Sequence, residues 1–162
     1  MYLLKLLETI DSFHRAPVTK RAIFPTGGAP YQPLLMLSLV RLFRRTDRAG
    51  GIIEYKDAKD ECRLLFERFF GPQDDTTFSP RAVQPFWVFG SGRSIRPPIW
   101  NLVPQTGKEG ELSEELIARK DPLKQESRLV ELVKHATLPS ETFEILRSEI
   151  ARKAIVSFTF QR

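Results

Sequence analysis

Cysteine and histidine are scarce in this chain of 162 residues, which contains one cysteine, Cys62, and two histidines, His14 and His135. A single cysteine excludes a disulfide within the chain and a zinc site built from several thiolates. The two histidines are far apart in sequence, so nothing indicates the histidine and carboxylate cluster that a metal-dependent nuclease requires. We therefore expect no catalytic residues, no metal and no other cofactor, and a reducing compartment, the cytoplasm, as the setting.

Long apolar runs and common catalytic motifs are also missing. No run approaches the ~20 apolar residues that a membrane-spanning helix needs, and charged residues interrupt the apolar pattern of the first 13 positions. The chain has no Gly-rich loop followed by Lys-Ser or Lys-Thr, and no Gly-x-Ser-x-Gly motif. These absences argue against membrane insertion and against the usual hydrolase sites.

The composition is that of an ordinary globular domain, with 41% hydrophobic and 28% charged residues. At this length we expect one domain over residues 1–162 with one core. Apolar residues at helical spacing predict helices over residues 3–13, 33–45, 57–70, 113–119, 125–135 and 141–155, with Asp57 as the N-cap of the third. A short strand is expected over residues 52–55. The predicted fold class is mostly helical α+β, resembling an elaborated winged helix-turn-helix with a small antiparallel sheet.

The middle of the chain predicts a β-ribbon, or wing. Residues 85–89 and 99–102 are rich in aromatic and β-branched side chains and lie on either side of a Gly-rich basic loop. The glycines would let the backbone of residues 90–96 approach DNA, where Arg93 and Arg96 could reach phosphates or guanine edges. Ile95, between them, would then contact a sugar or a base methyl group. The aromatic residues Trp87 and Trp100 are expected in the core and not as platforms for base stacking.

The basic charge is segregated along the chain. Residues 14–48 contain seven basic residues against one acid, residues 81–108 contain four basic residues and no acid, and the whole chain has a net charge of +5. If the two stretches meet in space, they form a surface that attracts phosphate. Charge alone is equally compatible with scattered, solvated basic residues. On the first interpretation, the candidate contacts to DNA are Arg15, Lys20, Arg21, Pro30, Ser91, Gly92, Arg93, Ser94, Arg96 and Lys108.

Two motifs carry a resemblance to a known family. Residues 29–37, Ala-Pro-Tyr-Gln-Pro-Leu-Leu-Met-Leu, resemble an Ala-Pro-His-Lys/Arg-Pro-Leu-Leu-Leu-Leu signature that opens a central helix. Residues 84–87, Gln-Pro-Phe-Trp, resemble a Tyr-Pro-Phe-Trp strand. Between the two motifs a helix ends in the aromatic pair Phe69-Phe70, and after the second motif comes a closing helix. The resemblance therefore spans about residues 25–155. The family is the sulfur-binding domain of McrA-type, modification-dependent HNH restriction endonucleases.

This resemblance implies a function and a site. Domains of this kind recognise double-stranded DNA in which sulfur replaces a non-bridging phosphate oxygen, as the recognition module of a type IV restriction system. An HNH nuclease domain, fused or associated, would supply cleavage. The residues that the resemblance places around the sulfur are Tyr31, Gln32, Gln84, Pro85 and Val88. The sequence departs from the family where Gln32 replaces a basic residue and Gln84 replaces an aromatic one.

Two alternatives remain open at this point. The chain could be a protein-interaction or regulatory winged-helix module, in which aromatic strands pack on a partner and the basic loops are merely solvated. It could also belong to a longer DNA-cleaving enzyme with nuclease residues beyond Arg162. Cleavage assays separate the second alternative from a binding module. A salt titration of DNA binding separates a protein-interaction module from the DNA-binding module and from the DNA-cleaving enzyme.

Overall fold

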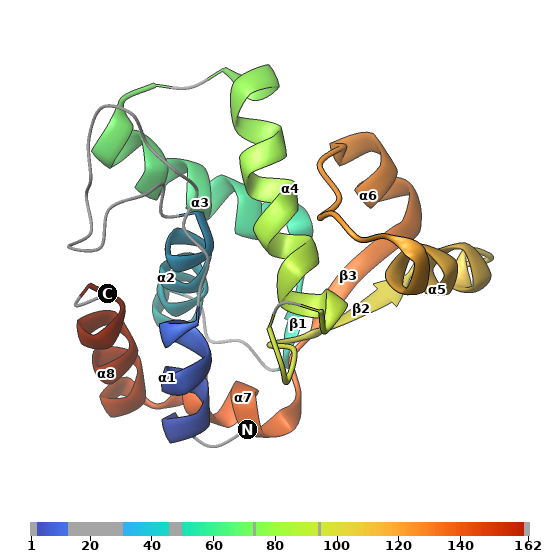
Figure 1. Ribbon diagram of the computed structural model, residues 1–162. Coiled ribbons are helices and arrows are strands. Elements are labelled where there is room, and N and C mark those ends of the chain that lie inside the picture. The colour runs from blue at the N-terminus through green and yellow to red at the C-terminus, as the bar shows by residue number, and fades with distance from the viewer. Residues whose placement is uncertain (1–2, 13–30, 46–49, 73, 94, 161–162) are drawn as a thin grey trace.

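The mostly helical α+β class is confirmed by a computed structural model, which describes residues 3–12, 31–45, 50–72, 74–93 and 95–160 (Figure 1). Most of this part of the chain is helical, and it contains one small sheet. The helices are α1 (Leu3–Asp11), α2 (Tyr31–Arg45), α3 (Tyr55–Phe70), α4 (Asp75–Ser91), α5 (Glu109–Ala118), α6 (Glu126–Leu132), α7 (Ser140–Arg147) and α8 (Glu149–Phe160). None of the described helices has the length and apolar character needed to cross a bilayer.

The sheet has three antiparallel strands, β1 (Ile52–Ile53), β2 (Asn101–Pro104) and β3 (Val133–Thr137). Their order is β1-β3-β2, so the strand that comes last in sequence lies in the centre. Ala136 of β3 pairs with Ile53 on one side and with Leu102 on the other, and Thr137 likewise pairs with Ile52 and Asn101. The β2–β3 ladder is irregular between Val103 and Pro104.

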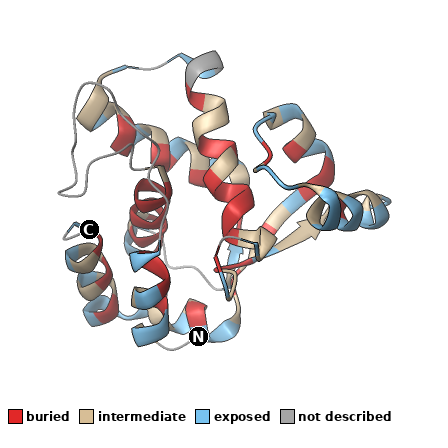
Figure 2. Ribbon diagram, viewed as in Figure 1, coloured by how far each residue is buried: buried red, intermediate tan, exposed pale blue. Residues whose placement is uncertain are grey.

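Helix α2 is the centre of the helical part and is buried from Gln32 to Val40 (Figure 2). Its sequence is apolar almost all round, as a helix covered on several sides requires. The neighbours that cover it are α3, α4, α7 and α8. Its one buried hydroxyl, Ser38 Oγ, donates to the carbonyl oxygen of Leu34 at 2.7 Å and so leaves no unsatisfied donor. The predicted central buried helix is confirmed, with a start two residues before Pro33.

The predicted strand at residues 85–89 is wrong, because these residues belong to α4. The run from Phe86 to Phe89 is buried, and a short, fully buried apolar run fits a helix as well as a strand. Pro80 and Pro85 both lie inside this helix, although proline interrupts the backbone hydrogen bonding of a helix interior. The predicted ribbon is therefore absent between residues 85 and 102, and β2 pairs with β3.

Trp100 is fully buried where α4 ends, and it fixes the return of the chain toward β2. Its indole Nε1 donates to the carbonyl oxygen of Phe86 at 3.1 Å, and its ring centroid lies 4.7 Å from that of Phe86 and 5.3 Å from that of Phe89. The backbone N–H of Ile99 donates to the Phe89 carbonyl at 2.8 Å. The chain approaches so closely that a Cβ at Gly90 would lie 2.6 Å from Leu102 Cγ. The expected core position of the aromatic residues is confirmed.

Several further boundaries differ from the predictions. The strand predicted over residues 52–55 ends at Ile53, and the helix predicted over residues 113–119 begins at Glu109 and ends at Ala118. Helix α3 begins after Glu54, so Asp57 lies inside its first turn and is not the N-cap. The helix predicted over residues 125–135 ends at Leu132, and His135 lies in β3. The helix predicted over residues 141–155 is two helices, which meet at Ser148.

Candidate nucleic-acid interface

Tyr31 and Gln32 lie in the first turn of α2, where this helix packs against α3 and α4. The Tyr31 ring stacks on Phe66 of α3, with 5.8 Å between centroids and 27° between planes. Phe66 in turn stacks on Phe70 at 4.4 Å and contacts Phe78 at 5.6 Å. We call these four rings, Tyr31, Phe66, Phe70 and Phe78, the aromatic cluster. Phe66 and Phe78 are buried, so Tyr31 and Phe70 are the members of the cluster that contribute partly exposed aromatic surface near the start of α2.

Helix α4 contributes a cation beside Tyr31 and Phe66, and Arg63 of α3 lies over Phe78 at 5.1 Å. The guanidinium carbon of Arg81 lies 5.7 Å from the Tyr31 centroid and 5.4 Å from the Phe66 centroid, which is cation–π geometry. Gln84, Pro85 and Val88 follow Arg81 at intervals of three, four and seven residues, so all four side chains share one face of α4. The two segments that carry the family resemblance therefore belong to helices that pack together.

Two of the residues predicted to contact the sulfur are buried in the interior of the protein. Pro85 is buried, and Val88 is only 4% exposed. Gln32 is also buried, at 8% exposure. The predicted cup with open walls at Pro85 and Val88 is therefore wrong, since neither residue offers surface to a ligand. Tyr31, Arg81 and Gln84 are partly exposed, as is Phe70 of the aromatic cluster.

The electrostatics at this end of α2 favour an anion. A helix N-terminus carries a partial positive charge and unpaired backbone N–H groups. The first turn of α2 contains no acidic residue that would offset this charge. Arg81 also brings a positive charge to this end of α2, because its guanidinium lies over the Tyr31 ring. A phosphate group suits such a position because it can accept hydrogen bonds from both the guanidinium and the backbone.

The basic loop after α4 turns back onto the protein. Ile95 is 1% exposed and belongs to the core, so its predicted contact with DNA is wrong. Gly92 has a φ of 70°, a left-handed conformation that favours glycine. Arg93 donates to the carbonyl oxygens of Leu116 and Ile117, in the last turn of α5. The Nε of Arg96 donates within the loop, to the Gly92 carbonyl at 2.8 Å.

Other basic residues are held by carboxylates. Lys108 Nζ lies 3.1 Å from Glu111 Oε1 and 3.4 Å from Glu131 Oε1, and the hydrogen bond to Glu111 is the main cause of the raised pKa of Lys108. Arg41 and Arg45 both bind the carboxylate of Glu61. Glu61 offsets one of these two positive charges and Lys108 has two carboxylate partners, which weakens the idea that all basic residues of the two stretches form one face. Of the remaining predicted DNA contacts, Ser91 is the last residue of α4, where its hydroxyl donates to the Val88 carbonyl oxygen at 3.4 Å. Arg15, Lys20, Arg21, Pro30 and Ser94 lie outside the described residues.

Sequence reasoning missed Arg81 as a site residue, although it counted this residue within the second basic stretch. Its role depends on reading residues 75–91 as a helix, because only helical spacing puts Arg81 on the same face as Gln84. It also missed Phe66, whose contact with Tyr31 joins residues 35 positions apart. No local pattern in the sequence signals such a contact.

Arg93 should stabilise the fold through its hydrogen bonds to α5. We expect Arg93→Ala to lower the free energy of unfolding by about 1 kcal/mol, because two carbonyls in the last turn of α5 lose a cationic donor. Arg96→Ala is the matched control and should have a smaller effect, since Arg96 bonds only within its own loop. Urea denaturation measures both values. Equal losses would contradict the docking of Arg93 on α5.

No known protein-family model matches this chain, and a search among curated proteins finds no similar sequence.

Proposed function

We propose that this chain binds double-stranded DNA carrying a phosphorothioate linkage, at the N-terminal end of α2, and leaves cleavage to a separate HNH nuclease domain of a type IV restriction system. One observation carries the proposal: the Arg81 guanidinium lies over the rings of Tyr31 and Phe66, beside the first turn of α2. A cation, the positive end of a helix dipole and a partly exposed aromatic ring therefore meet at one place. The resemblance of residues 29–37 and 84–87 to sulfur-binding domains supports the same ligand.

A phosphorothioate presents two different chemistries to such a place. Its negative charge and remaining oxygens suit Arg81 and the start of α2, as any phosphate would. Its sulfur is larger, softer and a poorer hydrogen-bond acceptor than oxygen, and so suits the face of an aromatic ring. Tyr31 is the partly exposed ring of the aromatic cluster that lies next to Arg81. We assign sulfur contact to Tyr31 and charge recognition to Arg81.

Rejection of oxygen should supply most of the selectivity. Burying a few tens of Å² of sulfur at ~25 cal/mol per Å² gives only about 1 kcal/mol. An ordinary phosphate oxygen placed against an apolar ring loses its hydrogen bonds to water and gains no donor in return. This loss costs about 2 kcal/mol or more. The sum is roughly 3 kcal/mol, or about a hundredfold in affinity if the site is fully dry. A partly solvated ring such as Tyr31 should achieve a fraction of this.

The first expected outcome is a preference for sulfur. In competition between duplexes identical except for one phosphorothioate, the modified duplex should bind at least about tenfold more tightly. Tyr31→Ala should reduce this preference more than it reduces affinity for unmodified DNA, because it removes ring surface and no charge. Tyr31→Phe is the matched control and should keep the preference. Equal affinity of the parent protein for both duplexes would overturn the proposal.

Arg81 should act on both duplexes alike. We expect Arg81→Gln to weaken binding to modified and unmodified DNA by similar factors and to lower the slope of log K against log salt by about one. Arg147→Gln, on α7, removes an exposed arginine elsewhere and should leave the slope unchanged. A folded Arg81→Gln variant with the parent's affinity and slope would place the DNA elsewhere on the surface.

A further inference from the structure

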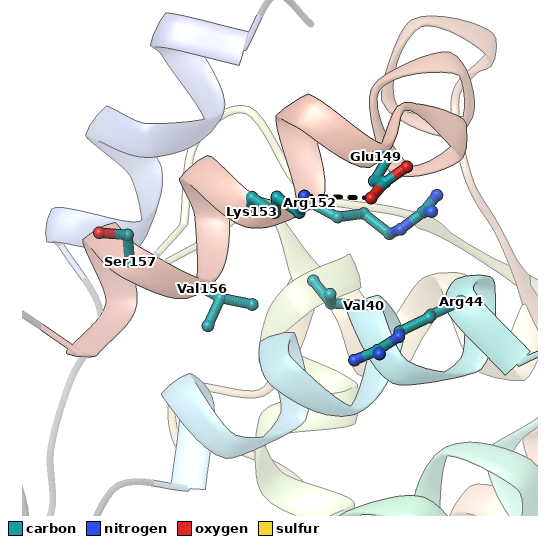
Figure 3. A pocket seen from close by; sticks show the side chains of 7 residues that line it. All are labelled: Val40, Arg44, Glu149, Arg152, Lys153, Val156 and Ser157. Atoms are coloured by element: carbon teal, nitrogen blue, oxygen red, sulfur yellow. Dashed lines mark ion pairs between the residues drawn. The ribbon is translucent and has the colours of Figure 1, made fainter.

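A groove of about 540 Å³ lies between α2 and α8, away from the aromatic cluster (Figure 3). Tyr31 is at the first residue of α2, whereas Arg44 of the groove is 13 residues further along, a distance of about 20 Å along a helix. The charged end of the groove, at Arg44, is therefore at the opposite end of α2 from the proposed DNA site, and Val40 lies between them. The residues that line it are Val40, Arg44, Glu149, Arg152, Lys153, Val156 and Ser157.

Helical spacing explains why these residues face one another. On α8, positions 149, 152, 153, 156 and 157 lie on one side of the helix, and on α2 positions 40 and 44 are one turn apart. Val40 and Val156 face each other across the gap and form its apolar part (Figure 3). The charged residues of α8 lie toward the end of this helix that follows α7. The groove thus combines an apolar floor with a charged rim.

The three cations of the rim are held differently. Arg152 is fixed, because its NH1 donates to the carbonyl oxygens of Leu146 and Arg147, each at 2.8 Å. Lys153 Nζ pairs with Glu149 Oε1 at 3.1 Å, and this contact is the first cause of the lowered pKa of Glu149. Arg44 is exposed, and its positive charge acts on Glu149 across the groove, because it contributes to the lowered pKa of that carboxyl group. With three cations and one carboxylate, the rim has an excess of positive charge.

We propose that this groove binds a small organic anion with an apolar body, a carboxylate or phosphate monoester whose charged head contacts Arg44 and Arg152. The volume lies within the ~300–1,000 Å³ range of ordinary ligand sites. Arg152 is already oriented, so a head group need not pay the full cost of ordering it. Glu149 repels additional negative charge, which favours a ligand with a single charged head over a polyanion. The valines match an aliphatic or aromatic body and have no counterpart in a phosphodiester backbone.

Three probes separate the two features of this ligand. Octanoate has an anionic head and an apolar body, 1-octanol keeps the body without the charge, and acetate keeps the head without the body. Isothermal titration calorimetry of the whole chain should give saturable binding of octanoate with one site. Binding of 1-octanol and of acetate should each be at least about tenfold weaker, since each loses one of the two contributions.

Variants locate the binding site. Arg44→Gln should weaken octanoate about five- to tenfold, the usual effect of losing one charge-assisted hydrogen bond. Ser157→Trp adds a large ring at an exposed position of the lining and should block octanoate without a change of charge. Arg68→Gln is the matched control, because Arg68 is also an exposed arginine in the last turn of a helix but lies on α3, outside the groove. It should bind octanoate as the parent does.

Four results would overturn the proposal. These are the absence of saturable octanoate binding at millimolar concentration, equal binding of 1-octanol, parent-like affinity in folded Arg44→Gln and Ser157→Trp, and displacement of octanoate by an unmodified duplex at low salt. The last result would assign the groove to the nucleic-acid surface. Failure here leaves the proposed DNA site untouched, because that site is tested with Tyr31 and Arg81. Circular dichroism of each variant establishes that it is folded.

Discussion

Replacing Trp100 with alanine should lower the free energy of unfolding by about 3–5 kcal/mol, the range for a large aromatic residue removed from a packed core. Trp100 is fully buried, contacts two phenylalanine rings of α4 and donates from its indole to the Phe86 carbonyl. Alanine would leave a cavity between α4 and the start of β2. It would also remove the hydrogen bond that ties the returning chain to α4.

A second variant separates these two contributions. Trp100→Phe keeps an aromatic ring at the same place but has no N–H donor, so we expect a smaller loss, about 1–2 kcal/mol. Chemical denaturation followed by far-ultraviolet circular dichroism gives both values. If Trp100→Ala unfolded at the same denaturant concentration as the parent, the packing of residues 99–104 against α4 would be incorrect.

The other large effect is expected at Glu61, a carboxylate of α3 that α2 neutralises. Glu61 is 3% exposed, whereas the side chains of its partners Arg41 and Arg45 are 37% and 56% exposed. The two sides of this interaction are therefore not equivalent. The arginine side chains reach water by themselves, whereas the buried Glu61 carboxylate depends on the arginines to compensate its charge. Removing both arginines strands a buried charge, at a cost of about 3–5 kcal/mol. Either single alanine variant should cost less, since the other arginine still binds Glu61.

The control for this prediction removes the charge instead of its partners. Adding Glu61→Gln to the double variant Arg41→Ala, Arg45→Ala should recover part of the lost stability, because a neutral amide is less costly to bury than a carboxylate. Urea denaturation of the parent, the double and the triple variant measures the recovery. If the triple variant were less stable than the double, the buried carboxylate would not be the source of the cost.

The sequence predicts the helices that have one buried face well and the fully buried segments poorly. The amphipathic pattern at the start of the chain predicts α1 to within two residues. Residues 86–89 carry no such pattern, because α4 is buried on every side there. In so short an apolar run, the two-residue period of a strand cannot be distinguished from the 3.6-residue period of a helix. Pro80 and Pro85 add a local signal against a helix. Tertiary burial overrides this signal.

The two segments that carry the family resemblance belong to helices that pack together, but the side-chain exposure predicted for the second segment is wrong. The two motifs at residues 29–37 and 84–87 identify α2 and α4, which do pack together. Which side chains are exposed there depends on the helical phase of α4, and the strand interpretation gives the wrong phase for Pro85 and Val88. The position of Arg81 over Tyr31 follows from the same phase. One wrong secondary structure thus changes every side-chain assignment on that segment.

The central position of β3 in the sheet constrains how the chain can fold during its synthesis. The strands at residues 52–53 and 101–104 each pair with β3 and not with each other, and β3 ends at Thr137. At a translation rate of roughly 5–20 residues per second, β1 therefore waits several seconds for its partner. A chain shortened to end before Val133 would keep two strand edges without the strand that joins them. Such edges promote aggregation, so fragments for expression should extend beyond Thr137.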